Sequence, residues 1–265
     1  MTTVHTLASG SSGNALVCSC GPTHLLLDAG ISCRRIAASL GQLGLAPAGL
    51  SAILITHTHS DHISGLATLL KRTQCPILAT DAACRQLSWR LAGIESRLLP
   101  LPLCVPFSIG EIAVTAFPTS HDSPGSCGFR FDTADGAFGL LTDSGYVTEE
   151  AADILPGVDL AVLEANHDVD ALRSGPYPYY LKQRILGPEG HLSNDAAAEF
   201  AVTLARSGAA ELVLAHLSRE NNTPAMAENA VLASLSAAAL TPILSVAPRE
   251  TMSRAYLVRR TVCKR

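Results

Sequence analysis

Six short apolar runs, each followed by a polar residue and a turn, limit the fold of this chain more than any other feature. Short apolar runs that end in turn chemistry are typical of strands buried in a core. The polar residues that follow them include histidines and aspartates. We therefore predict buried strands whose ends carry chemically active side chains. The runs lie at residues 25–27, 52–55, 112–117, 138–141, 160–163 and 211–215.

Helical patterns separate these runs. We expect helices over residues 65–71, 81–91, 193–206 and 224–240, and the third begins with Ser193, a residue type that caps helix N-termini. Strands mixed with helices predict a layered α/β architecture. Two successive sets of strands, each followed by helices, favour two sheets flanked by helices. Because composition changes nowhere abruptly, we expect a single domain over residues 1–265.

Composition and charge narrow the function classes. A chain that is 48% hydrophobic and 16% charged is typical of a compact enzyme. The net charge of −4 argues against broad neutralisation of nucleic-acid phosphates, so such a partner would have to be bound at a local site. No apolar run approaches the ~18 residues that span a membrane, and residues 1–7 lack the pattern of a secretory signal. We expect no membrane partner and a cytoplasmic location.

The cysteines are expected to be buried free thiols, because they have no repeated C-x-x-C spacing and no secretory signal accompanies them. Cys18 and Cys20 alternate in a segment that is typical of a strand, so both should lie on one face. A metal site there is not expected. The eight cysteines are at positions 18, 20, 33, 75, 84, 104, 127 and 263.

The densest group of potential metal ligands is formed by His57, His59, Asp61 and His62, directly after an apolar run. Imidazole and carboxylate groups suit zinc and related divalent ions. In a loop that leaves a strand, residues i and i+2 can converge on one ion while i+4 and i+5 turn toward a second. The alternative is a solvated polar turn, but three of the nine histidines fall within these six positions.

Three further ligand candidates, His121, Asp143 and His216, each follow an apolar run and so can reach the same edge of the sheets. Each of them alone has an alternative interpretation as a capping or packing residue. Together with the cluster they make five histidines and two aspartates, a set that suits two divalent ions with one aspartate and a water between them. We expect Zn²⁺, with Mn²⁺ or Fe²⁺ as alternatives, because His/Asp sites accept all three.

The His-x-His-x-Asp-His motif at 57–62, followed by the later His, Asp and His, resembles the metallo-β-lactamase superfamily over nearly the whole chain. The resemblance implies a four-layer αββα sandwich with a dinuclear site at one edge. It also implies that Asp143 bridges the ions and that Asp28 holds the metal loop by hydrogen bonds, although Asp28 alone could simply open a turn. By motif, the first ion would take His57, His59 and His121, and the second Asp61, His62 and His216.

The branch of the family is indicated by Asp143 and by four further segments. True β-lactamases typically have cysteine at the position of Asp143, whereas the hydrolase and nuclease branches have aspartate. Together the segments resemble the YycJ/WalJ-like branch, bacterial metallo-hydrolases related to RNase Z and the β-CASP nucleases. That resemblance implies a phosphodiesterase, and an exonuclease that acts on DNA. The segments are residues 8–14, 164–168, 190–194 and 216–222.

The resemblance also implies catalytic histidines. Two neighbouring ions can orient a phosphate, activate the water between them as hydroxide and stabilise the leaving oxygen. In related nucleases a histidine near position 191 contacts the scissile phosphate or protonates the leaving group. We give this role to His191, with His167 as a second candidate, and count the ligand Asp61 as catalytic too. The alternatives are a turn residue for His191 and a structural loop histidine for His167.

Two segments have weaker signals. The Ser/Gly loop at 9–13 can present N–H groups to a phosphate, but it lacks the lysine of a P-loop and is more often a tight turn. The segment 177–184 combines three of the five tyrosines with Lys182 and Arg184. Stacking on nucleic-acid bases is one interpretation; packing of the aromatic rings ahead of the His191 loop is the one we prefer.

Three functions follow from these patterns. The first is a dinuclear phosphodiesterase or exonuclease on DNA, in a chain too continuous for an inserted β-CASP domain. The alternative is a hydrolase of small esters, thioesters or lactones on the same site, which the acidic net charge favours. A non-catalytic binding protein would have lost ligands, and none of the expected set is missing. The sequence leaves the oligomeric state open.

Overall fold

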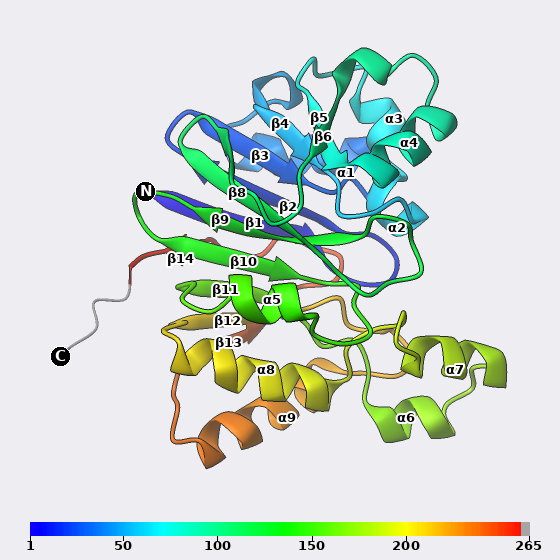
Figure 1. Ribbon diagram of the computed structural model, residues 1–265, viewed down its shortest axis with the longest axis vertical. Coiled ribbons are helices and arrows are strands. Elements are labelled where there is room, and N and C mark those ends of the chain that lie inside the picture. Colours follow the sequence, from blue (N-terminus) through cyan, green and yellow to red (C-terminus); the bar gives the residue numbers. More distant parts are fainter. Residues whose placement is uncertain (261–265) are drawn as a thin grey trace.

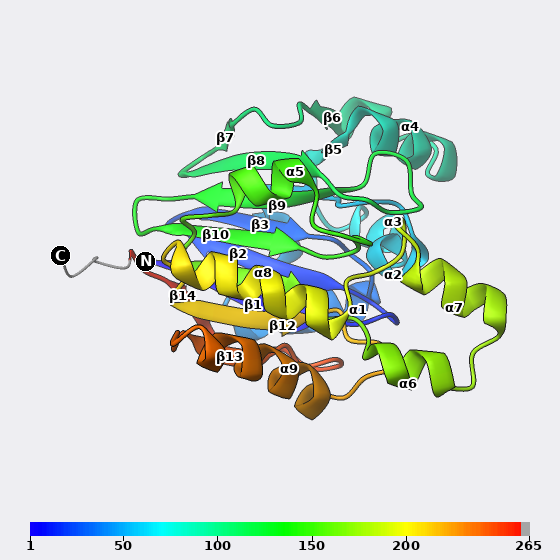
Figure 2. The ribbon, with the colours of Figure 1, turned by 60° about the horizontal axis from the view of Figure 1, so that its bottom comes forward.

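The computed structural model of the chain describes residues 1–260, whose strands form two sheets that lie face to face (Figure 1). Each sheet has seven strands, in the orders β14-β1-β2-β3-β4-β5-β6 and β13-β12-β11-β10-β9-β8-β7. Helices cover the outer face of each sheet (Figures 1 and 2). The predicted α/β class and four-layer αββα sandwich are therefore confirmed.

The first sheet combines an antiparallel and a parallel part. Strands β1 to β3 pair antiparallel, β3 to β6 run parallel, and the late strand β14 returns to pair antiparallel with β1. Its strands are β1 Thr2–Ala8, β2 Ala15–Cys20, β3 Thr23–Leu27, β4 Ala52–Leu54, β5 Ile77–Thr80, β6 Leu98–Leu101 and β14 Tyr256–Val258. The helices that follow them are α1 Cys33–Gln42, α2 Ser60–Ile63, α3 Leu66–Leu69 and α4 Asp81–Arg90.

The second sheet repeats this plan in the later half of the chain. Strands β7 to β10 pair antiparallel and β10 to β13 run parallel. Its strands are β7 Phe107–Ile109, β8 Ile112–Pro118, β9 Cys127–Asp132, β10 Ala137–Leu141, β11 Leu160–Glu164, β12 Glu211–Ala215 and β13 Ile243–Val246. Its helices are α5 Glu149–Ile154, α6 Val169–Ser174, α7 Tyr179–Leu186, α8 Asn194–Arg206 and α9 Pro224–Ala237.

Side chains of one strand alternate between two cores, which explains why the predicted strands are apolar throughout. In β4, Ala52 and Leu54 join the core between the sheets, whereas Ile53 faces the core beneath the helices. Between the sheets, Phe131 and Phe138 stack with ring centroids 4.2 Å apart. Both faces of the parallel strands are therefore covered, as is usual for such strands.

The helix boundaries differ from the expectation at two places. The helix expected over 65–71 is the short α3, Leu66–Leu69. The helix expected over 224–240 ends at Ala237, because Ala239 adopts a left-handed backbone with φ 55°. The helix expected at 193–206 is α8, and Ser193 caps it by accepting from Ala196 N.

Helices α6 and α7 extend away from the sandwich (Figures 1 and 2). Asp168 caps α6 by accepting from Ala171 N. Lys182 Nζ on α7 donates to the carbonyl of Arg173 on α6 at 2.7 Å, which ties the two helices together. Of the seventeen residues that line the cavity described below, several come from α7 and the residues just before it.

Six of the cysteines are buried free thiols, as predicted, and Cys18 and Cys20 both face the core between the sheets. The prediction is wrong for Cys104, which is exposed where the chain turns with φ 59°. Cys263 lies outside the described residues. No helix within residues 1–260 has the length and apolar character to cross a membrane.

Candidate metal centre

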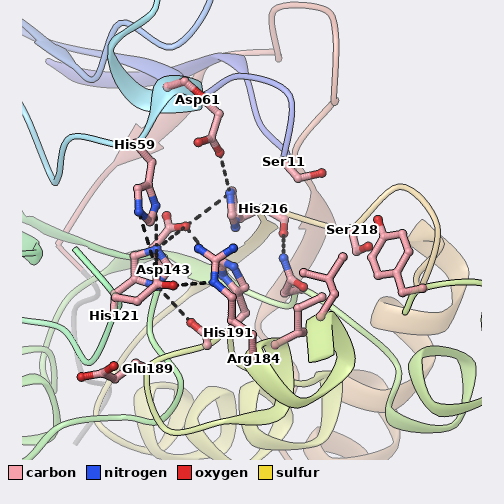
Figure 3. A pocket seen from close by; sticks show the side chains of 17 residues that line it. Ser11, His59, Asp61, His121, Asp143, Arg184, Glu189, His191, His216 and Ser218 are labelled. Carbon is pink, nitrogen blue, oxygen red and sulfur yellow. Dashed lines mark hydrogen bonds and ion pairs between the residues drawn. The ribbon is translucent and has the colours of Figure 1, made fainter. Parts of the chain in front are cut away.

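The seven predicted ligands meet at one edge of the sandwich, in the segments that follow β4, β8, β10 and β12. Figure 3 shows five of them: His59, Asp61, His121, Asp143 and His216. Their ligand atoms fall into overlapping groups whose members lie within 4.8 Å of one another. Two of these groups are the two ligand sets that the sequence motif predicts. The first is His57, His59 and His121, and the second is Asp61, His62 and His216.

Asp143 lies between the two groups. Its Oδ1 is 3.9 Å from His121 Nε2 and 3.5 Å from His216 Nε2, and its Oδ2 is 3.4 Å from His62 Nε2. The carboxylate therefore faces members of both groups with its two oxygens. This is the arrangement that a bridging ligand requires.

Strained backbone at strand ends directs several of these side chains. Asp28, Asp143 and His216 follow β3, β10 and β12 with φ of 58°, 59° and 57°. Within residues 1–260 they are three of the five non-glycine residues with positive φ. Left-handed backbone is unfavourable for such residues and tends to occur at functional sites. Here it turns each side chain sharply across the edge of its sheet.

The imidazoles are oriented through one ring nitrogen. His62 Nδ1 lies 2.7 Å from Asp28 Oδ2, His216 Nδ1 lies 2.8 Å from Glu164 Oε1, and His121 Nδ1 lies 3.1 Å from the carbonyl of Gly190. Each Nδ1–H donates to its oxygen, which leaves Nε2 to face the centre. Such outer contacts fix the tautomer and ring angle of histidine ligands.

Asp28 does hold the metal loop by hydrogen bonds, as the resemblance implied. It is buried and accepts from the backbone N and the hydroxyl of Thr56, each at 2.9 Å, as well as from His62. Asp28 also directly follows β3, where the chain turns. It is therefore a turn residue, as in the alternative interpretation, and a hydrogen-bond acceptor for the metal loop at once. The loop that begins at Thr56 is thereby attached to the neighbouring strand.

The residues at this edge fit two divalent ions. His57 Nε2, His216 Nε2 and Asp143 Oδ2 are buried and have no hydrogen-bond partner within residues 1–260. Two nitrogens, His59 Nδ1 and His121 Nε2, face each other at 3.1 Å. Buried polar atoms without partners are costly, and lone pairs directed at a common space are satisfied by a cation. The donor set of imidazole and carboxylate suits Zn²⁺ and its neighbours.

The buried carboxylates at this edge stabilise positive charge on the neighbouring histidines. Burial would lower the pKa of His216, but the charge of Asp143, the nearby carboxylate of Asp61 and the hydrogen bond to Glu164 raise it to about 10. Burial would likewise raise the pKa of Asp143, but the charges of His216 and His62 hold it well below its ordinary value. A metal ion that binds here therefore displaces protons from histidines.

Sequence reasoning missed the role of Glu164 at the end of β11. Its carboxylate is fully buried and accepts from His191 Nδ1 at 2.9 Å, from His216 Nδ1 at 2.8 Å, and from the backbone N of Ser144 and Leu192. The signal was available, because Glu164 follows an apolar run just as Asp143 does. It also missed Asp122, whose Oδ1 lies 3.6 Å from both His59 Nε2 and His121 Nε2.

The two proposed catalytic histidines differ in position. His191 lines the cavity at the site, and its ring centroid lies 5.1 Å from that of His121 and 5.3 Å from that of His216. His167 is not among the residues that line this cavity; it is 1% exposed, and neither ring nitrogen has a partner within residues 1–260. The structure therefore brings His191 to the site and leaves His167 beneath it.

The cavity has a volume of about 390 Å³, and four of the seventeen residues that line it are acidic. Its ionised side chains include Asp61, Asp122, Asp143 and Glu189. Arg184 of α7 is the one Arg or Lys among the lining residues within the described chain. Figure 3 shows Arg184 among the side chains that line the cavity.

The structure also shows the roles of the Ser/Gly loop at 9–13 and of the tyrosine segment at 177–184. The loop at 9–13 is a tight turn, as preferred: Gly10 N donates to Asn14 Oδ1, and Gly13 N donates to the carbonyl of Gly10. The preferred packing role for the tyrosine segment is wrong for Tyr179 and Tyr180, which are 77% and 74% exposed. Helix α7 has no buried residue to anchor these rings.

Comparison with known proteins agrees with this geometry. A family model described as "Beta-lactamase superfamily domain" matches residues 23–217. The chain is 38% identical over 237 residues to Exodeoxyribonuclease WalJ of Streptococcus pneumoniae, with 88% of each protein covered. It is 35% identical over 231 residues to Exodeoxyribonuclease YycJ of Bacillus anthracis, with 85% of this chain and 86% of the relative covered.

Solved structures share the fold at lower identity. The metallo-β-lactamase fold protein YhfI from Bacillus subtilis superposes with a TM-score of 0.75 at 19% identity, covering 95% of this chain and 98% of that one. Zn²⁺-bound PqqB from Methylobacterium extorquens superposes with a TM-score of 0.72 at 17% identity, covering 96% of this chain and all of the other. At these identities the similarity concerns the fold alone.

Proposed function

Since the chain belongs to the β-lactamase superfamily and is a metal-dependent hydrolase, we propose that it is a dinuclear phosphodiesterase that removes nucleotides from the ends of DNA strands. One observation carries this proposal: a bridging position occupied by Asp143 between two ligand groups, with His191 beside them in an open cavity. A phosphodiester needs its negative charge balanced and a proton donor near its leaving oxygen, and this arrangement supplies groups for both needs.

Two sets of residues would hold the ions, with Asp143 shared between them. Two divalent ions, when bound, supply Lewis acidity that balances phosphate charge and lowers the pKa of water. Zn²⁺ is the ion we expect, with Mn²⁺ or Fe²⁺ as alternatives. The first set is His57, His59 and His121, and the second is Asp61, His62 and His216.

His191 is the proposed residue for proton transfer or phosphate contact at the leaving group. Its Nδ1–H donates to Glu164 Oε1 at 2.9 Å, so its Nε2 remains for the substrate. Glu164 is a positioning residue, because it sets the ring angle of His191 while also accepting from His216. Glu164 Oε1 thus connects His191 in the cavity to His216, a proposed metal ligand.

DNA is proposed as the substrate on the strength of the relatives' names and coverage. Both of the relatives described above are named exodeoxyribonucleases, and the similarity extends over most of each chain. The net charge of −4 means that the strand must be held locally at the site. The test below also decides whether RNA is cleaved and from which end of the strand digestion starts.

The test is digestion of 5′-labelled single- and double-stranded DNA by protein loaded with Mn²⁺ or Zn²⁺, with and without a chelator. We expect chelator-sensitive release of nucleotides from an end. Asp143→Asn should lower kcat about 100-fold or more and reduce bound metal, because it removes the shared carboxylate. Asp153→Asn, on the exposed face of α5, is the matched control and should resemble the wild type.

An alternative activity, hydrolysis of small esters, thioesters or lactones, is favoured by the acidic lining of the cavity. Chelator-sensitive turnover of acyl substrates by a protein that leaves DNA and RNA intact would replace the nuclease proposal with this one. If Asp143→Asn retained full activity on any substrate, the bridging role of that residue would be wrong.

A further inference from the structure

Arg184 has a position that the metal centre does not explain. It comes from α7, outside the sandwich, yet it lines the cavity at the metal centre as the one Arg or Lys among the lining residues described. Around it the cavity has Asp61, Asp122 and Glu189. Among the Asp, Glu, Arg and Lys side chains of the lining, four are carboxylates and one is a guanidinium, so beyond the ions expected at the metal centre Arg184 is the charged side chain that can attract a polyanion.

Asp122 holds the guanidinium of Arg184 by one side only. Arg184 Nε donates to Asp122 Oδ2, and neither terminal nitrogen has a hydrogen-bond partner within residues 1–260. The Arg184 side chain is 56% exposed. The two terminal nitrogens, with four N–H donors between them, are therefore available to a ligand, in the planar geometry that arginine uses to bind phosphate oxygens.

The Asp122–Arg184 pair is also attached to the metal centre. Asp122 directly follows His121, and its Oδ1 faces His59 Nε2 and His121 Nε2 at 3.6 Å. The backbone N of Asp122 donates to the carbonyl of Glu189, which fixes the carboxylate against the neighbouring loop. One carboxylate thus separates the guanidinium from the first ligand group, close enough for one substrate to contact both.

We infer that Arg184 binds a phosphate of the nucleic-acid substrate beside the metal centre and that Asp122 positions it. The inference rests on the proposed function, because it names the group that holds the substrate of that same site. The phosphate is either the one that is cleaved or its neighbour along the strand. Both have the same chemistry, so two substrates are needed to tell them apart.

The test compares steady-state kinetics of the Mn²⁺-loaded wild type, Arg184→Gln and Arg184→Lys on a 5′-phosphorylated oligothymidine and on bis(p-nitrophenyl) phosphate. On DNA, Arg184→Gln should raise KM about tenfold or more with bound metal and Tm unchanged, and Arg184→Lys should recover only part, since it keeps the charge but not the fork. If Arg184→Gln raises KM for both substrates, Arg184 binds the phosphate that is cleaved. If it raises KM only for DNA, Arg184 binds the neighbouring phosphate of the strand.

Arg85→Gln is the matched control. Arg85 forms an exposed pair with Asp81 on α4, with side chains 69% and 65% exposed, and neither residue lines the cavity. This variant should leave the KM for DNA unchanged. If Arg184→Gln also leaves it unchanged while the wild type digests DNA, the inference is overturned and the proposed function stands.

The positioning role of Asp122 is tested by a double-mutant cycle. Asp122→Asn should raise the KM for DNA, and Asp122→Asn with Arg184→Gln should be no worse than the poorer single variant. If the effects of the two substitutions on KM are additive, Asp122 does not position Arg184, and that part of the inference is wrong. Anisotropy of a fluorescent oligothymidine provides a binding readout: a wild type that neither binds nor cleaves it overturns the proposed function and the inference together.

Discussion

Glu164 receives two histidine nitrogens on a single oxygen, His191 at 2.9 Å and His216 at 2.8 Å. Burial would raise the pKa of this carboxyl, but the charge of His191 and the hydrogen bonds from His191 and His216 lower it to about 2. The group is therefore ionised throughout the physiological range. It can hold both rings in place without exchanging a proton itself.

His167 leads to a prediction about pH. Burial lowers its pKa from 6.5 to about 4, so between these values the unfolded chain binds a proton that the folded chain excludes. Its contribution to stability is present above pH 6.5 and is lost as the pH falls toward 4. From pH 7 to pH 5, the metal-free wild type should lose about 2 kcal/mol more free energy of unfolding than His167→Gln.

Urea denaturation of both proteins at the two pH values measures this difference. Chelator is present throughout, so that acid release of metal does not contribute. Equal losses for the two proteins would mean that His167 is charged or solvated in the folded chain. They would also reopen its catalytic role, which its position beneath the cavity disfavours.

The ligands were predictable at this scale because each lies in a segment that leaves the end of a strand. A side chain near the carboxyl end of a strand can reach the sheet edge whatever the rest of the loop does. Glu164, the last residue of β11, satisfied the same rule and lies in one of the four segments that indicated the branch of the family, but that pattern gave it no role of its own. Arg184 could not have been found this way: its place in the cavity depends on where α7 packs, which no local pattern specifies.

At the scale of elements, three loops approach one another closely enough for their backbones to form hydrogen bonds. Asn14 N donates to the carbonyl of Asp61 at 2.8 Å, and Gly30 N donates to the carbonyl of Asn14 at 2.8 Å. A Cβ atom on Gly30 would lie 1.6 Å from the Asp61 carbonyl oxygen. The absence of a side chain at Gly30 thus permits the metal loop to pack against the loop after β3.

Gly30→Ala should therefore displace Asp61 and its loop. We expect a loss of about 2 kcal/mol or more in the free energy of unfolding, together with less bound metal. Gly41→Ala is the control: a Cβ there meets nothing within 4 Å, and the residue lies in α1. That variant should be unchanged or more stable by about 0.5–1 kcal/mol.

Urea denaturation and metal content after gel filtration report the two effects. Equal stability of the two alanine variants would contradict the backbone packing described for the loops. A loss of stability without a loss of metal would separate the packing of Gly30 from the position of Asp61.

Among the elements, those with long apolar runs were predictable and the edge strands were not. The central strands β10, β11 and β12 are buried along their whole length, and apart from Glu164 and Glu211 at strand ends their residues are apolar. At the edges, β6 and β7 have exposed residues and β6 contains Pro100. Such strands satisfy few packing constraints, and their sequences resemble loops.

At the scale of the whole molecule, the proposed ligands come from both sheets. His57, His59, Asp61 and His62 follow β4 of the first sheet, whereas His121, Asp143 and His216 follow strands of the second. Ions bound between them would connect the two layers at the edge where the core ends. Metal binding is therefore coupled to the stability of the complete sandwich.

Removal of metal should lower Tm. At about 100 times its Kd, each ion contributes about 2.7 kcal/mol, which corresponds to roughly 5–10 °C per ion for a chain of this size. Differential scanning fluorimetry with and without EDTA measures the shift. Asp143→Asn should begin at the lower Tm and respond little to the chelator; a wild type that is equally insensitive would contradict the coupling.

The pairing of β1 with β14 imposes an order on the making of this protein. Thr2 pairs with Val258 and Val4 with Tyr256, so a strand that leaves the ribosome first waits for a segment much later in the sequence. Until then β1 is an open edge, with backbone groups that a neighbouring chain can pair with. Strand β14 thus protects the nascent sheet against association with other chains, and it can do so only after all the strands between the two have been synthesised.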